Sequence, residues 1–115
     1  MENVIANKSY RFAVRIVKLC KYLQQKKKEY TLSTQLLRSG TSIGANVAEA
    51  HFAQSTADFV SKFSIALKEA GETDYWLRLL KDSDYLTEKE FRSIYNDCRE
   101  ILKILASIVK TSKNS

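Results

Sequence analysis

The sequence predicts an all-α fold, an up-down-up-down antiparallel four-helix bundle, and three observations support it. The 115 residues include no proline and only three glycines, which favours long helices over a many-stranded sheet. Apolar residues recur at spacings of three and four, the period of one helix face. The amphipathic segments are each about 20 residues long and are separated by short connections. This length and pattern fit a single domain over residues 1–115.

The first helix is predicted over residues 7–27, with one apolar side and one basic side. The apolar side consists of Phe12, Ala13, Ile16, Val17, Leu19, Cys20 and Leu23. The basic side consists of Lys8, Arg11, Arg15 and Lys18, with Lys21 close by. Lys26, Lys27 and Lys28 follow at the carboxyl end, where cations interact favourably with the helix dipole.

The second helix is predicted to be capped by Ser33 or Thr34 and to extend to about residue 52. Its apolar face consists of Leu36, Gly40, Ile43, Val47 and Ala50. Glycine inside a helix costs about 1 kcal/mol relative to alanine. We therefore expect Gly40 and Gly44 to be compensated by close approach of a neighbouring helix, which makes this the most tightly packed helix.

The third helix, over residues 57–81, follows a capping arrangement of Ser55 and Asp58. One apolar face consists of Phe59, Phe63, Ala66, Leu67, Ala70 and Leu77. Ile65, Trp76 and Leu79 lie on nearly the opposite side. A helix with two apolar faces needs two neighbours, so we predict that the second face packs against another subunit.

Thr87 and Glu90 form the sequence pattern of a capping box at the start of the fourth helix. The helix has a heptad seam of Phe91, Ile94, Cys98, Ile101, Leu105 and Ile108, widened by Tyr95, Leu102 and Val109. Its basic side consists of Arg92, Arg99, Lys103 and Lys110, which fall within about 40° around the helix axis. Residues 111–115 are expected to be a frayed tail.

The formal net charge of +6 indicates a surface that attracts polyanions. No apolar run approaches the ~18 residues of a membrane span and no signal-peptide core precedes the first helix, so a cytoplasmic location is expected. Cys20 and Cys98 sit in apolar runs and are expected to be buried thiols; a disulfide between them is the less favoured alternative.

Enzymatic and metal chemistry find little support. Gly40–Gly44 matches the G-x-S-x-G nucleophile elbow, but that motif needs a preceding strand and acid and histidine partners. Di-iron bundles need two Glu-x-x-His pairs, and this chain has one histidine, His51, which is expected at the surface or an interface. No phosphate-cradling glycine loop is present, so no cofactor is predicted.

A polar cluster is predicted on the second and third helices. Arg38, Ser42 and Glu49 align on one side of the second helix, and Asn46 lies nearby. Glu69 and Glu72 are available on the third helix. These residues form either a solvated surface or an ion-pair network. The more specific hypothesis is that Arg38 pairs with Glu69 or Glu72, across helices or subunits, and fixes their register.

Residues 35–50 and 66–77 resemble the bacterial four-helix-bundle family named after 23S rRNA intervening sequences, whose relatives include the accessory variability determinant of diversity-generating retroelements. The resemblance covers essentially the whole chain. It implies a small cytoplasmic bundle that assembles as a homopentameric barrel and has no known enzymatic activity. For the retroelement branch it implies a basic surface that engages nucleic acid and a reverse transcriptase. The family's motif residues, with roles in fold and assembly, are Arg38, Ser39, Gly40, Ser42, Ile43, Asn46, Glu49, Glu69, Glu72 and Trp76.

The leading functional hypothesis is a non-enzymatic, oligomeric, basic scaffold that binds RNA or DNA through phosphate contacts without sequence preference. Its predicted contacts are Lys8, Arg11, Arg15, Lys18, Lys21, Lys26, Lys27, Lys28, Arg92, Arg99, Lys103 and Lys110. Its predicted oligomer interface comprises Arg38, Ser42, Asn46, Glu49, Ile65, Glu69, Glu72, Trp76 and Leu79. The alternative is a protein-binding adaptor, for example for a reverse transcriptase, whose basic faces serve solubility or an acidic partner.

Overall fold

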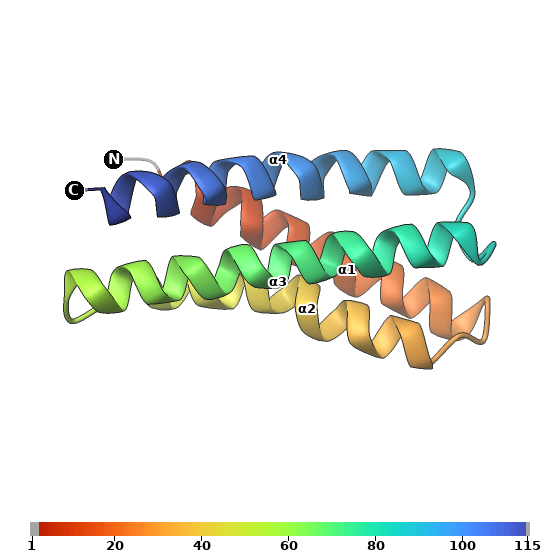
Figure 1. Cartoon of the computed structure of the whole chain (residues 1–115). Helices are drawn as coiled ribbons and strands as arrows, with labels where there is room; N and C mark the ends of the chain where they lie inside the picture. The colour runs from red at the N-terminus through yellow and green to blue at the C-terminus, as the bar shows by residue number, and fades with distance from the viewer. Residues whose placement is uncertain (1–2, 115) are drawn as a thin grey trace.

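The computed structural model describes residues 3–114, and over this range the chain forms four α-helices and no strand. They are α1 (Val4–Gln25), α2 (Thr31–Ala50), α3 (Thr56–Asp82) and α4 (Glu88–Lys113). Consecutive helices run in opposite directions, and the start of α1, the α2–α3 connection and the end of α4 lie at the same end (Figure 1). The molecule measures 45 × 24 × 20 Å, and its long dimension matches the ~40 Å length of a 27-residue helix such as α3. The predicted all-α fold is confirmed, and its helices form an antiparallel bundle.

At three of the four helix starts, the side chain of the residue just before the helix forms the cap. Asn3 Oδ1 accepts a hydrogen bond from the Ala6 backbone N–H at 3.2 Å, so α1 starts earlier than the predicted residue 7. At α3, Ser55 Oγ accepts from the Asp58 N–H at 3.1 Å, as predicted. At α4, Thr87 and Glu90 form both bonds of the predicted capping box, at 3.2 and 2.8 Å. Each cap pairs backbone donors that the first helical turn leaves unused.

The predicted cap of α2 is wrong. The helix begins at Thr31, before Ser33 and Thr34, and the residue that satisfies its first N–H groups is Glu29. The Glu29 carboxylate accepts hydrogen bonds from the backbone N–H groups of residues 31, 32 and 33 at 3.2, 3.0 and 2.8 Å. The first N–H groups of α2 are therefore bound by a carboxylate from the preceding connection. The sequence pattern had predicted a hydroxyl for this role, but that hydroxyl lies inside the helix.

Other boundaries also differ from the predictions. Helix α1 ends at Gln25, so Lys26, Lys27 and Lys28 lie in the connection, and α2 ends at Ala50 rather than near residue 52. Helix α4 continues through Lys113, so most of the tail predicted at 111–115 is helical, and Ser115 lies outside the described residues.

The two glycines of α2 lie against α1, as their positions predicted. A Cβ atom built on Gly40 would come within 2.8 Å of two side-chain carbons of Ile16, and one built on Gly44 within 3.1 Å of the Ser9 carbonyl oxygen. The missing side chains thus let the two helices approach closely, and Ile16 is fully buried in the space that Gly40 leaves.

The core largely follows the predicted faces, with differences on three helices. On α3, Leu80 is fully buried although it was on neither predicted face. On α4 the last buried position is Val109, whereas Ile108 is only half-buried. An α-helix has 3.6 residues per turn, so a straight helix drifts away from a strict heptad and the seam moves to Val109 in the last turn. On α1, Val17 was placed on the apolar side, but its side chain is 38% exposed.

Each helix packs against its neighbours in the chain, and the contact between α1 and α4 is the sparsest of the bundle. Within the described range, no helix is long and apolar enough to cross a membrane.

Candidate nucleic-acid interface

The basic side of α1 is partly neutralised by α4. Lys8 forms an ion pair with Glu100, and Arg15 forms one with Asp97. Arg15 also donates a hydrogen bond to Ser93 Oγ at 2.9 Å. The predicted basic row of α1 therefore meets an acidic row of α4 across the sparse α1–α4 contact, and two of its cations are already occupied.

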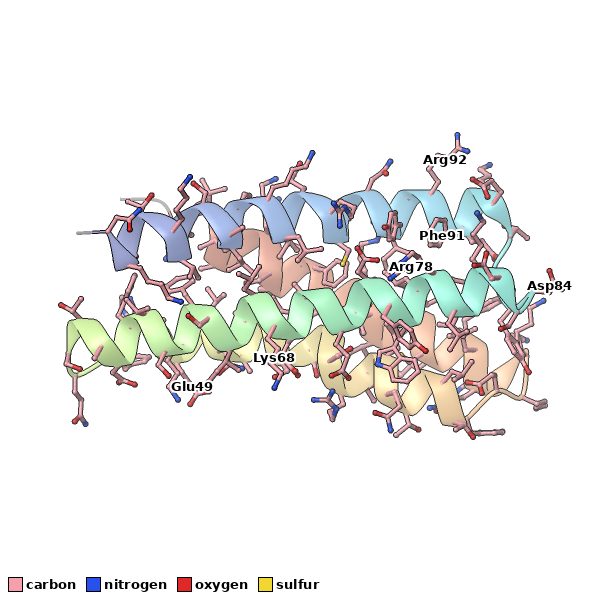
Figure 2. The ribbon with its side chains drawn as sticks, viewed as in Figure 1. Glu49, Lys68, Arg78, Asp84, Phe91 and Arg92 are labelled. Carbon is pink, nitrogen blue, oxygen red and sulfur yellow. The ribbon has the colours of Figure 1, made fainter. Side chains whose placement is uncertain are left out.

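The basic row of α4 lies on a different side of that helix. Arg92 pairs with Glu88 one turn earlier at 2.7 Å and points away from the bundle (Figure 2). Arg99 reaches α3, where it pairs with Asp74 at 2.9 Å. The structure thus separates the two predicted rows: one lies on α1 beside α4, and the other lies on the outer face of α4 next to α3.

The remaining predicted cations are exposed. Lys27 Nζ lies 6.0 Å from the centre of the Tyr22 ring, a cation–π arrangement at the end of α1. Seven further cations have no carboxylate of residues 3–114 within ion-pair distance. These cations are Arg11, Lys18, Lys21, Lys26, Lys28, Lys103 and Lys110.

Asp74 is the centre of the polar contacts between α3 and α4. Its side chain is 8% exposed, and it accepts hydrogen bonds from Arg78 Nε at 2.7 Å and Arg99 Nη1 at 2.9 Å. Tyr95 Oη lies 3.2 Å from both carboxylate oxygens. Burial raises the pKa of the Asp74 carboxyl, but the hydrogen bonds from Arg78, Arg99 and Tyr95 outweigh it, and the pKa lies below its ordinary value.

This lowered pKa predicts a pH dependence of stability. A carboxylate whose pKa is lower in the folded state stabilises the fold above its ordinary pKa, and this contribution is lost as the pH falls through the folded-state value. We expect Asp74→Asn to lower the unfolding free energy by about 1 kcal/mol at pH 7, since both arginines are half-exposed. The deficit should shrink at pH 3, measured by urea denaturation at both pH values. An equal deficit at both would show that the charge of Asp74 is not responsible.

A second polar network joins α2 to α3. Arg38 Nη1 donates to Glu69 Oε2 at 2.8 Å, and Arg38 also forms an ion pair with Glu72. Trp76 Nε1 donates to the same Glu72 carboxylate at 3.0 Å. Hydrogen bonds from Trp76 and then Arg38 lower the pKa of Glu72. The hypothesis of an Arg38 pairing across helices is confirmed, and both candidate glutamates take part within one chain.

The other predicted interface residues also lie along α2 and α3. Asn46 is buried and donates to the Ser42 carbonyl oxygen at 2.9 Å, and Glu49 pairs with Lys62 of α3 at 3.4 Å. Trp76 and Leu79 are half-buried, whereas Ile65 is 41% exposed. Their role in an oligomer stays a prediction.

The two cysteines are buried, and the histidine is exposed. Cys20 and Cys98 are free and buried, as expected, and burial raises the pKa of each thiol to about 12. His51 lies exposed at the end of α2. No group of three or more potential metal ligands occurs in the part of the chain that the structure describes.

Sequence reasoning missed Asp74 and Arg78 as site residues. Their spacing of four on one helix was a visible signal for an ion pair. The convergence with Tyr95 and Arg99 was not visible, because it depends on the register between α3 and α4. That register is also marked by Cys98 Sγ, which lies 3.6 Å from the Ala70 carbonyl oxygen.

These features define a small all-α bundle with exposed lysine and arginine side chains and two interhelical ion-pair networks. The sequence profile of the 23S rRNA-intervening sequence protein family matches residues 1–107, and the chain belongs to this family. It is also similar to a crystal structure of a protein of unknown function from the S23 ribosomal protein family of Bacteroides thetaiotaomicron, with 57% sequence identity and a TM-score of 0.92. That similarity covers 93% of this chain and 99% of the other. No curated protein matches the sequence.

Proposed function

We propose that this protein is a non-enzymatic scaffold that associates with copies of itself and binds the phosphodiester backbone of RNA or DNA without sequence preference. The observation that carries the proposal is the set of exposed cations with no carboxylate partner among the described residues, on α1, on the α1–α2 connection and on α4. Cations that are not neutralised by the protein are available to replace the counterions of a nucleic acid.

Self-association is supported by apolar side chains that the single chain leaves exposed. Tyr10 is 70% exposed, Phe52 79%, Ile65 41% and Tyr75 49%. Covering such side chains with a second copy would remove apolar surface from water, which favours association. The number of copies that we propose, five, rests on the family resemblance, and the interface on the α2–α3 residues predicted from the sequence.

Fluorescence anisotropy with a labelled single-stranded RNA of mixed sequence tests nucleic-acid binding. We expect binding at low salt, weakening steeply as salt is added. About four phosphate contacts would give a slope near −3 in a plot of log K against log salt concentration. A second RNA of unrelated sequence should bind equally well, because phosphate contacts carry no sequence information.

Light scattering coupled to size-exclusion chromatography tests self-association of the same preparation. A particle of several chains supports the scaffold, and a monomer contradicts the proposed role of the exposed apolar residues. Absence of RNA binding at low salt would instead favour the adaptor alternative, in which the cationic faces contact an acidic protein partner.

A further inference from the structure

The outer side of the α3–α4 pair carries two arginines that are held in place by one buried carboxylate. Arg78 binds one oxygen of Asp74 through Nε, and Arg99 binds the other through Nη1. Their side chains nevertheless remain 56% and 49% exposed. Figure 2 shows Arg78 reaching from α3 toward α4. Each guanidinium has five N–H donors, so each keeps N–H groups for a ligand after binding Asp74.

The arrangement differs from the ion pairs of Arg15 and Arg92, although Arg38 is likewise held by a nearly buried carboxylate, that of Glu69, whose side chain is 9% exposed. The partners of Arg15 and Arg92 are themselves exposed, with Asp97 at 50% and Glu88 at 54%. Asp74 is 8% exposed and is also hydrogen-bonded by Tyr95, so its position is fixed by packing. An arginine held in one geometry loses less side-chain entropy when it binds a phosphate, and its planar group suits a phosphate's oxygen atoms.

A glycine on the same side of α3 leaves room for a ligand. Gly71 is exposed in the middle of the helix, and a Cβ atom built on it would meet nothing within 4 Å. Packing within the chain therefore does not explain this glycine, although glycine destabilises the interior of a helix relative to alanine. Gly71 and Arg78 are seven residues apart and so lie on one helix face. The contact of neighbouring Ala70 with Cys98 places Gly71 at the level of Arg99.

We propose that Arg78 and Arg99, positioned by Asp74, form a preorganised binding site for a backbone phosphate of nucleic acid beside Gly71. The site rests on the proposed nucleic-acid function and extends the outer basic row of α4 onto α3. The arginines contact the phosphate, and Asp74 is a positioning residue. Net charge balance permits this role, because two guanidinium groups surround one carboxylate.

Asp74→Asn distinguishes a positioning role from simple electrostatics, because the two predict opposite changes in RNA affinity. The substitution removes a negative charge, so attraction of the whole surface for RNA should increase. If Asp74 positions the arginines, binding should instead weaken, by about threefold to tenfold. The matched control is Asp97→Asn, which also removes one arginine-paired carboxylate from the bundle but leaves the Asp74 site intact. It should bind RNA as tightly as wild type or more tightly.

Arg78→Gln provides a second variant, in which the Asp74 carboxylate itself is kept together with its bonds from Arg99 and Tyr95. It should lower RNA affinity about fivefold and flatten the salt slope by about 0.7, the loss of one phosphate contact. Lys62→Gln, which removes an ion-paired cation elsewhere on α3, should have a smaller effect on both quantities. RNA and DNA strands of the same sequence should respond alike, since the proposed contact is to phosphate.

The measurements are made by anisotropy at 10 °C, with circular dichroism to confirm that each variant is folded. If wild type binds RNA but Asp74→Asn binds at least as tightly as Asp97→Asn, the positioning role is overturned. If Arg78→Gln matches Lys62→Gln, the phosphate site is overturned while general nucleic-acid binding remains. Failure of wild type to bind RNA would overturn the proposed function itself.

Discussion

Gly40→Ala should destabilise the protein by about 1–3 kcal/mol, although alanine is the better helix former. The added Cβ would lie 2.8 Å from Cγ1 and Cγ2 of Ile16. These atoms are attached directly to the Ile16 Cβ, so they cannot move away without a shift of the whole side chain or of α1. Because Ile16 is fully buried, such a shift disturbs close-packed neighbours.

Gly71→Ala is the matched control, because it makes the same chemical change inside another helix. With open space around the new methyl group, it should stabilise the protein by about 0.5–1 kcal/mol. Urea denaturation of both variants at pH 7 checks the opposite signs. Ile16→Ala removes the atoms that the new methyl group would meet. The loss of unfolding free energy in the double variant Ile16→Ala/Gly40→Ala should therefore be smaller than the sum of the losses in the two single variants. Stabilisation by Gly40→Ala would contradict the close approach of α1 and α2.

Glu29→Ala should lower the unfolding free energy by about 1–3 kcal/mol, since it leaves the first N–H groups of α2 without their acceptor. Glu29 is 8% exposed, and the Ser33 N–H that it binds at 2.8 Å is buried, so water replaces this partner poorly. The helix has no acidic residue in its first turn and no side-chain hydrogen bond from its N-cap, Tyr30.

Glu29→Gln removes the charge and keeps only part of the hydrogen bonding. The amide oxygen can accept either from the N–H groups of residues 31 and 32 or from that of residue 33, because the NH2 group takes the place of the other acceptor. The favourable interaction of a negative charge with the helix start, about 0.5–1 kcal/mol, is also lost. Thermal unfolding followed by circular dichroism should therefore rank the proteins as wild type, then Glu29→Gln, then Glu29→Ala. A Glu29→Ala protein as stable as wild type would mean that solvent satisfies these N–H groups.

The sequence alone predicted the features that depend on a single helix. Apolar periodicity located all four helices, the capping box at Thr87 and Glu90 was present as expected, and the small residues Gly40 and Gly44 marked a close helix contact. These features are local or need only the presence of a neighbour. The start of α2 was misplaced because the hydroxyls of Ser33 and Thr34 resemble caps, whereas the carboxylate of Glu29 satisfies the same donors from outside the helix.

The candidate site was only partly predictable because it depends on how helices face one another. The basic row with Arg99 could be read from α4 alone, but its meeting with Asp74 and Arg78 depends on the register with α3. In the same way, Lys8 and Arg15 looked available on α1 until packing brought Glu100 and Asp97 opposite them. Periodicity predicts the side of a helix on which a residue lies, but it does not predict which residue of the neighbouring helix lies opposite.

The four helices form an incompletely closed bundle, because the contact between α1 and α4 is sparse. The α2–α3 pair has the most extensive contact, and α1 and α4 are bridged by the exposed pairs of Lys8 with Glu100 and Arg15 with Asp97. Mobile ions screen such exposed pairs far more than they affect apolar packing. We therefore expect rising ionic strength to weaken the contact between α1 and α4 before it affects the packing of α2 against α3.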